Sequence, residues 1–272
     1  MKRTAPILVL LLAATPLFAK TKERVQLHCP LLDAQTTVLP QGVTTPWPKG
    51  EKLEFTLSWG PVAVGRADLW SKETVVTSTG TLMYHIVSTA RSNAFTDAFF
   101  KVRDVNESWI DVSSLTSHGY IQVMREGGFI WDEWMTFDTA TRRFDGLNED
   151  RGGNVEQMHG EIPGPIHDIL SALYYSRRQK LEVGKEFVID VNSRKNWPLV
   201  VKITGTDTVK AAGQTYNCFI AEPQMREKGL FVQKGKRLRV WLADDKYHTP
   251  VMLKAEVFIG HITGKLAKIT RD

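Results

Sequence analysis

An alternation of apolar and polar residues, repeated along most of the chain, constrains this sequence most strongly. The first clear example is LEFTLSW at residues 53–59, where Leu, Phe, Leu and Trp stand at every second position. Successive side chains of a β-strand point to opposite faces, so this period predicts a strand with one buried face. Similar runs follow at residues 82–87, 105–112, 120–125, 129–137, 187–191, 199–203, 216–221, 238–242 and 251–258.

Short turn sequences separate these runs, for example Glu126-Gly127-Gly128 and Ala211-Ala212-Gly213-Gln214. Connections this short join antiparallel strands, because parallel strands need a longer crossover. A flat sheet of about ten strands would curl or close on itself. We therefore expect a mainly β fold: a strongly curved antiparallel sheet or half-barrel of about ten strands.

Residues 166–178 break the alternation and predict an amphipathic helix after Pro163-Gly164-Pro165. Asp168 in its first turn and Arg177 in its last both suit the helix dipole. Such a short helix is marginal alone, so we expect it to pack on the concave face, as a permanent plug or as a lid over a ligand. Its apolar stripe consists of Ile166, Ile169, Leu170, Leu173 and Tyr174. A shorter helix is compatible with residues 92–100.

The first residues have the organisation of a cleaved secretory signal. Lys2 and Arg3 precede the apolar run 7–14, which is too short to span a bilayer, and Leu17-Phe18-Ala19 fits a cleavage site. We expect residues 1–19 to be a signal peptide, and the mature protein to reside in the periplasm. Residues 20–50, rich in Pro, Thr and Gln, should form an extended arm, followed by one β-rich domain over residues 51–272.

Charge and cysteine content set further limits. The 35 basic residues fall to 33 without the two in the signal, against 30 acidic residues, which leaves a formal net charge of +3. A charge this small gives no reason to expect a nucleic-acid partner. Cys29 and Cys218 could form a disulfide in an oxidising compartment, or Cys218 could be a buried apolar residue and Cys29 part of a loose arm. Both interpretations stay open.

The familiar catalytic and cofactor motifs are missing from the sequence. The seven histidines show no metal-ligand spacing, and there is no nucleophile elbow, phosphate loop or dinucleotide fingerprint. We therefore assign no metal, cofactor or catalytic residue, and an enzyme is the less favoured class. Asp244-Asp245-Lys246-Tyr247-His248 resembles a set of acids and bases, but it separates two alternating runs. The turn chemistry of Asp favours a hairpin there.

The stretch Trp131-Asp132-Glu133-Trp134 places two carboxylates between two tryptophans. Paired carboxyls can cleave glycosidic bonds, but neighbouring residues of a strand point to opposite faces. Glu133 would share a face with apolar side chains, where an unpartnered carboxylate is costly. It is therefore partnered, part of a binding site, or displaced by a bulge.

A basic cluster lies near the C-terminal end, at Lys234, Lys236, Arg237 and Arg239. Lysines on an edge strand discourage pairing with other sheets, which explains the cluster without a partner. Contact with an anionic lipid surface is the alternative.

Three stretches resemble the bacterial exported family catalogued as domain of unknown function 3108, over residues 48–266. They are GEKLEFTLSWGPVAVGRADLW (50–70), DILSALYYSRRQKLEVGKEFVIDV (168–191), and VWLADD (240–245) with Pro250-Val251 and Ile259-Gly260. This resemblance implies no established activity and no catalytic residues. It also implies a layout similar to the half-barrels of periplasmic lipoprotein carriers, which hold acyl chains; fold analogy alone does not establish function.

Three functions remain open. The leading hypothesis is a non-enzymatic carrier that holds an apolar or amphipathic small molecule in the concavity of its sheet. The second is an envelope assembly or scaffold factor that acts through protein contacts, and the third is a glycan-binding or glycan-cleaving protein built on Trp131–Trp134. The expected ligand-contacting residues are Trp131, Glu133, Met135, Leu173 and Tyr174.

Overall fold

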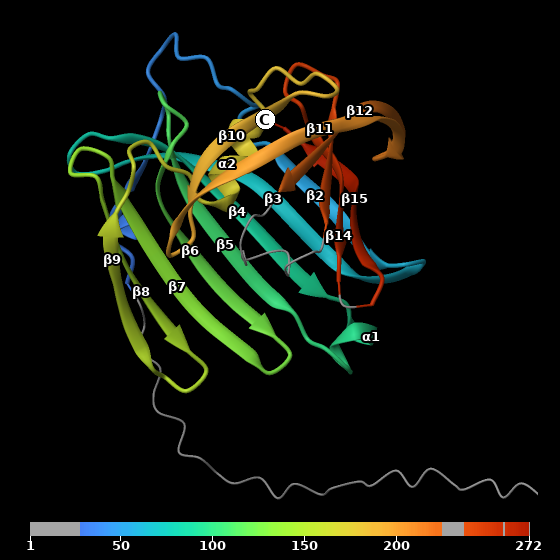
Figure 1. Ribbon diagram of the computed structural model, residues 1–272, viewed down its shortest axis with the longest axis horizontal. Coiled ribbons are helices and arrows are strands. Elements are labelled where there is room, and N and C mark those ends of the chain that lie inside the picture. The colour runs from blue at the N-terminus through green and yellow to red at the C-terminus, as the bar shows by residue number, and fades with distance from the viewer. Residues whose placement is uncertain (1–27, 225–236, 258, 272) are drawn as a thin grey trace, which may run out of the picture.

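The computed structural model describes residues 28–224, 237–257 and 259–271. Within them the chain forms a single antiparallel sheet of 15 strands with few helices (Figure 1). The strands are β1 (Gln35–Thr37), β2 (Lys52–Trp59), β3 (Val62–Val76), β4 (Leu82–Ser92), β5 (Arg103–Asp111), β6 (Ser117–Glu126), β7 (Phe129–Asp138), β8 (Arg143–Asp150), β9 (Val155–Glu161), β10 (Glu186–Asn192), β11 (Asn196–Ala211), β12 (Gln214–Gln224), β13 (Leu238–Ala243), β14 (Pro250–Glu256) and β15 (His261–Thr270). The helices are η1 (Pro30–Asp33), α1 (Ala94–Asp97) and α2 (Ile169–Ser176).

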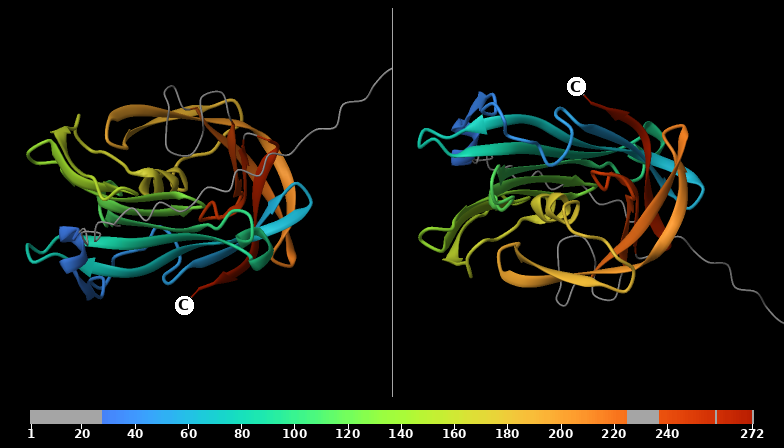
Figure 2. Two further views of the ribbon diagram at one scale, coloured as in Figure 1. Left: turned by 90° about the horizontal axis from the view of Figure 1, so that it is seen from below. Right: turned by 90° about the horizontal axis from the view of Figure 1, so that it is seen from above.

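Two meanders make up this sheet, β2 to β9 and β10 to β15. They are joined because the last strand, β15, pairs along the whole of β2, from Ile262 opposite Trp59 to Thr270 opposite Lys52. The spatial order therefore starts at β10, passes through β15 and β2, and ends at β9. The sheet is strongly curved and open, and Figure 2 shows it curling around α2. The expected mainly β, curved antiparallel architecture is confirmed.

The strand count differs from the prediction of about ten. Each of the ten alternating runs lies in a strand, and the five that the alternation missed are β1, β3, β8, β9 and β15. Strand β9 shows why, because it lies at an edge of the sheet and almost all of its side chains are exposed. A strand with no buried face has no apolar alternation by which it can be recognised.

Helix α2 is shorter than the predicted 166–178. Asp168 is its N-cap and forms a capping box with Ser171, so the helix cannot begin at Ile166, which packs instead beside Tyr120 and Met135. The buried face of α2 is formed by Ser171, Ala172, Tyr174 and Ser176, whereas Leu170 and Leu173 are half-buried. The predicted apolar stripe therefore only partly coincides with the buried face of the helix, which it shares at Tyr174. The shorter helix considered at 92–100 corresponds to α1.

The concave side of the sheet is filled by α2 and the side chains around it. Tyr174 is fully buried and its ring lies 4.4 Å from that of Trp47, with the two planes nearly perpendicular. Ala172 and Tyr175, on the other side of the helix, pack with apolar residues of β10 to β13. Helix α2 thus joins two halves of the core, which is the behaviour of a plug.

The β10 edge of the sheet is partly covered by the chain that connects β9 to α2. His167 forms a short parallel bridge with β10, with His167 N donating to the Asp190 carbonyl and Asn192 N to the His167 carbonyl, both at 2.9 Å. Ser117 N donates to the Ile166 carbonyl, which ties the same segment to β6. The two hydrogen bonds of His167 use backbone groups of β10 that would otherwise be free to pair with another chain.

Residues 28–50 are anchored to the domain through β1, which pairs with β3, and through Trp47. Trp47 is almost fully buried and donates its Nε1 to Ser71 Oγ at 2.8 Å. The expected signal peptide lies outside the described residues.

Cys29 and Cys218 are both free and buried, so the disulfide interpretation is corrected. Cys29 lies near Glu107, whereas Cys218 lies near Asp207 and Asp245, on a different part of the sheet. Burial raises the pKa of the Cys29 thiol to about 12 and that of Cys218 to about 11. Each cysteine behaves as a small buried apolar residue.

A buried ion pair fastens the C-terminal end of α2 to the start of the domain. Glu51 and Arg177 have fully buried side chains, and Glu51 Oε1 lies 2.7 Å from Arg177 Nη2. Arg177 Nε also donates to the Tyr247 carbonyl, and Arg271 reaches the second Glu51 oxygen at 3.1 Å. Removing one charge would leave the other uncompensated inside the protein.

Glu51→Gln should therefore lower the free energy of unfolding by about 3–5 kcal/mol, because Arg177 then stays charged without its partner. The double variant Glu51→Gln/Arg177→Met should recover at least about 1 kcal/mol of that loss. Urea unfolding followed by tryptophan fluorescence measures both. The single variant Arg177→Met completes the comparison. If the losses of unfolding free energy of Glu51→Gln and Arg177→Met add up to that of the double variant, the two side chains are not coupled.

Candidate functional site

A well-formed cleft lies between the N-terminal arm and β3. Residues 36–50 form one wall, residues 71–74 of β3 the other, and Trp47 and Tyr84 the floor. Its volume is about 500 Å³. It exists because β1 takes the place beside β3 that β2 has left, so the chain between β1 and β2 must loop outward. We call this the arm cleft.

Aromatic rings form the floor of the arm cleft. The rings of Trp47 and Tyr84 lie 4.9 Å apart with an interplanar angle of 61°. Tyr84 Oη is buried and has no hydrogen-bond partner among the described residues. Burial raises the pKa of Tyr84, with a smaller contribution from Asp111. A buried, unpartnered hydroxyl at a cleft is unusual, because leaving one without a hydrogen bond is costly.

The cleft has both apolar and polar lining residues. Val38, Leu39, Pro40 and Val43 line it from the arm. At the mouth are the exposed Lys49 and Lys72, and Glu73, which accepts a bond from Thr36 and approaches Lys72 Nζ to 3.2 Å. The hydrogen bond from Thr36 is the main reason that the pKa of Glu73 is lowered. This combination suits a ligand with an apolar body and a polar end.

The arm cleft is not apparent from the sequence, in which residues 20–50 are expected to form an extended arm leading into the domain. Strand β1 has only three residues, which are too few to show an apolar alternation. Only the pairing of β1 with β3, about 40 residues apart in sequence, creates the cleft.

Of the predicted ligand-contacting residues, Trp131, Glu133 and Met135 come together on the inner face of β7. Glu133 is almost fully buried and accepts hydrogen bonds from Tyr120 Oη, Trp131 Nε1 (3.1 Å) and Arg194 Nε (2.6 Å). The pairing of β7 with β6 has no bulge, so the first of the three alternatives for Glu133 holds: it is partnered.

Arg194 comes from the turn between β10 and β11, far along the sheet from β7. Its guanidinium lies 4.1 Å from the centre of the Trp131 ring, in addition to its bond with Glu133. Met135 is fully buried and its Sδ accepts from Tyr120 Oη. These contacts hold the turn against β7 and help to close the curl of the sheet. Asp132 points to the other face and binds Arg125, so the two carboxylates do not converge.

The other two predicted residues, Leu173 and Tyr174, are core residues of α2. A cavity between α2, β5 and β6 has a volume of only about 20 Å³, room for about one water molecule. Asp168 is buried beside it, and this burial raises the pKa of Asp168 despite hydrogen bonds from Ser108 and Ser171. The prediction of a ligand held under α2 has no space to support it in the described structure.

A pair of carboxyls that the sequence did not reveal lies where β5 begins and β6 ends. Asp104 and Glu126 are hydrogen-bonded to each other, and Arg125 N donates to Asp104 Oδ1 at 2.9 Å. Burial, followed by the neighbouring Asp104 charge, raises the pKa of Glu126 to about 7, and burial also raises the pKa of Asp104. Two such carboxyls share a proton near neutral pH. Neither described cavity includes them.

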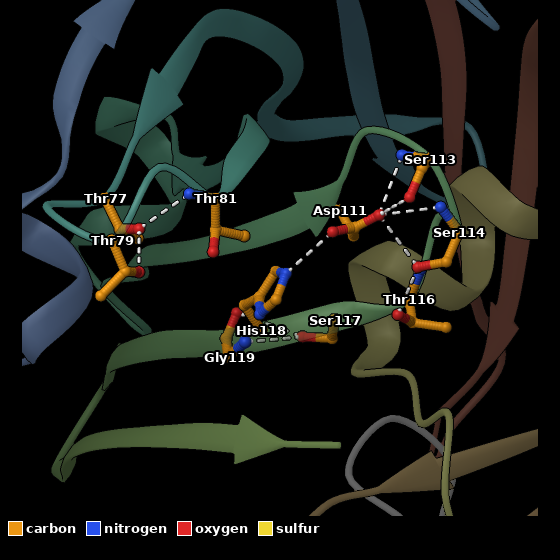
Figure 3. A network of polar contacts seen from close by, with 10 residues as sticks. All are labelled: Thr77, Thr79, Thr81, Asp111, Ser113, Ser114, Thr116, Ser117, His118 and Gly119. Atoms are coloured by element: carbon orange, nitrogen blue, oxygen red, sulfur yellow. Dashed lines mark hydrogen bonds and ion pairs between the residues drawn. The ribbon is translucent and has the colours of Figure 1, made fainter. Parts of the chain in front are cut away.

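A third polar cluster closes the turn between β5 and β6 (Figure 3). Asp111 Oδ1 accepts from the backbone and hydroxyl groups of Ser113 and Ser114, and Oδ2 lies 3.1 Å from His118 Nε2. Burial opposes ionisation of Asp111, but these bonds outweigh it and lower its pKa. The serine hydroxyls bind the carboxylate directly and not through His118, so this is no nucleophile–base arrangement.

The Asp244–His248 stretch is the turn between β13 and β14, as expected. Asp245 accepts bonds from Tyr247 N, Thr249 N and Thr249 Oγ1 at 2.8–3.1 Å, which is the local bonding of a turn. In the basic cluster, Arg239 pairs with Glu222 at 3.3 Å, and Lys234 and Lys236 lie outside the described residues.

Over the described ranges, no group of three or more His, Cys, Asp or Glu side chains is placed to hold a metal ion. None of the helices in those ranges is long and apolar enough to cross a membrane.

Residues 54–267 match the family described as "Protein of unknown function (DUF3108)", so the chain is a member of it, and the resemblance in the sequence is confirmed. No curated protein matches the sequence. Among solved structures, the chain is similar to a beta-barrel-like protein of domain of unknown function DUF1849 from Brucella abortus. The TM-score is 0.49 at 7% identity, over 83% of this chain and 100% of the other.

The stability of Glu126→Gln relative to the wild type should increase as the pH rises. With a folded pKa of about 7, Glu126 contributes stability that is full below about pH 4 and is lost as the pH rises through 7. The difference in Tm between Glu126→Gln and the wild type should therefore shift in favour of the variant from pH 5 to pH 8. The exposed carboxylate Asp145 provides a control, since Asp145→Asn should leave the Tm profile parallel to the wild type; a parallel profile for Glu126→Gln would contradict the shared proton.

Proposed function

We propose that this protein is an exported, non-enzymatic binding or carrier protein that holds an apolar or amphipathic small molecule in the arm cleft. The observation that carries the proposal is the cleft itself. Its volume of about 500 Å³ lies within the range of small-molecule sites, and apolar residues of the arm and the rings of Trp47 and Tyr84 form part of its lining. The signal-like residues 1–19 and the periplasmic location remain part of this proposal.

The site proposed here differs from the one that the sequence led us to expect. The concavity of the sheet is filled by α2, with Tyr174 packed on Trp47 and space for about one water molecule beside the helix. The arm cleft lies on the other side of Trp47, so the same tryptophan bounds both the core and the cleft. Glycan cleavage finds no support, because Asp132 and Glu133 are separately bonded on opposite faces of β7.

Two features of the cleft can meet polar groups of the ligand. The Tyr84 hydroxyl can donate to a buried oxygen of the ligand, and Lys49 and Lys72 can neutralise an anionic group at the mouth. An amphiphile with an anionic head at the mouth and a second oxygen deeper in the cleft satisfies both.

Val43→Asp should weaken binding of a fluorescent fatty acid, 11-(dansylamino)undecanoic acid, by about tenfold or more, because a charge then lines the apolar wall. Val43 is exposed at the cleft, so the fold should tolerate the change. Fluorescence titration of the full mature chain measures the Kd. Val183→Asp, at another exposed valine that lies outside the cleft, is the matched control and should bind as the wild type does. The proposal fails if the wild type takes up no probe, or if both variants lose it equally.

Tyr84→Phe should separate stability from binding. Removing an unpartnered buried hydroxyl should raise the free energy of unfolding of the ligand-free protein by about 1 kcal/mol. The same change should weaken binding of the fatty-acid probe about three- to tenfold, the loss expected for one hydrogen bond. Urea unfolding and the titration above provide the two values. Unchanged probe affinity would exclude the Tyr84 hydroxyl as a contact.

A further inference from the structure

Large apolar side chains are exposed at one end of the sheet, at the tips of successive hairpins. The turns β2–β3, β6–β7 and β14–β15 and the α1 region between β4 and β5 all lie at this end, because every second turn of a meander does (Figure 1). We call the exposed residues of these turns the apolar rim: Trp59, Phe95, Phe99, Phe100, Phe129 and Ile259. Phe99 is 79% exposed and Phe95 66%.

The rim residues are grouped in two places along this end. Trp59 Nε1 donates to the Ile259 carbonyl at 2.8 Å, which joins two of the turns. Phe95 and Phe99 are in edge contact at 5.7 Å, and the ring of Phe100 lies directly against Gly127 of the β6–β7 turn. Several large exposed apolar side chains at one end of a protein are typical of an interaction site.

This rim is separate from the arm cleft. Strands β2 and β3 run between them, with Trp59 at the rim end and Ser71, opposite the start of β2, at the cleft end. Neither described cavity is lined by a rim residue, so the rim presents protruding side chains and no groove. Protruding tips suit a broad, deformable partner better than a single peptide.

The charges at this end favour an anionic partner. Carboxylates at this end are bonded within the protein: Asp97 to Arg103 at 2.6 Å, Asp150 to the backbone of its own turn, and Asp104 and Glu126 to each other. Lys101 and Arg151 are exposed beside them.

We propose that the apolar rim docks on the surface of an anionic lipid bilayer, with its aromatic side chains at the level of the headgroups. Aromatic side chains prefer that layer, and adjacent cations add attraction to anionic lipid. The proposal rests on the rim alone and holds whether or not the arm cleft binds a ligand.

Flotation of the mature chain with unilamellar vesicles tests this proposal. The wild type should bind vesicles of phosphatidylcholine that contain the anionic lipid phosphatidylglycerol more tightly than vesicles of phosphatidylcholine alone. Phe95→Ser/Phe99→Ser should weaken binding to the anionic vesicles at least about tenfold, because two exposed rings can no longer enter the interface. Lys101→Gln/Arg151→Gln should reduce only the preference for anionic lipid, by about fivefold for each charge.

Val183→Ser/Val188→Ser is the matched control, since both valines are exposed away from the rim. It should bind vesicles as the wild type does, and circular dichroism should show that every variant is folded. The proposal is overturned if the wild type does not float with anionic vesicles, which would leave the rim to a protein partner. It is also overturned if the control loses as much binding as the rim variant.

Discussion

The pairing of β15 with β2 is the constraint on which the rest of the structure depends. It joins two meanders that are far apart in sequence into one sheet, with β9 and β10 left as its edges. A curved sheet of this size has a concave apolar face, which must be covered in water. Helix α2 covers it, held at its N-terminal end by the hydrogen bond from Ser108 of β5 to Asp168 and at its C-terminal end by the buried Glu51–Arg177 pair.

This filled interior changes where function can reside. A half-barrel with an empty concavity would hold its ligand under the helix, but here the helix itself occupies that space. Polar side chains that could have formed a catalytic centre are instead used in packing: Glu133 and Arg194 hold a distant turn against β7, and Asp111 closes the turn that follows β5. The features left over are at the two ends of the strands, the arm cleft at one and the apolar rim at the other.

Individual residues show how far the sequence analysis could go. The alternation around Glu133 correctly placed it on the apolar face and required a partner, but it could not identify Arg194, which is 61 residues away. The prediction that Asp244–His248 forms a turn needed only local chemistry and was correct. The cysteines show the opposite case, since a disulfide depends on distance in space and their spacing in the chain carries no such information.

The sequence by itself determined the class of fold, ten of the strands, the presence of α2 and the family, because each of these follows from short-range periodicity or from motifs. The tertiary structure alone decided the remaining five strands, the limits of α2 and the arm cleft. Those features arise where β1 meets β3, β15 meets β2 and Trp47 meets Tyr174. Contacts between residues distant in the chain depend on how the whole sheet curves, and no local pattern of side chains records that curvature.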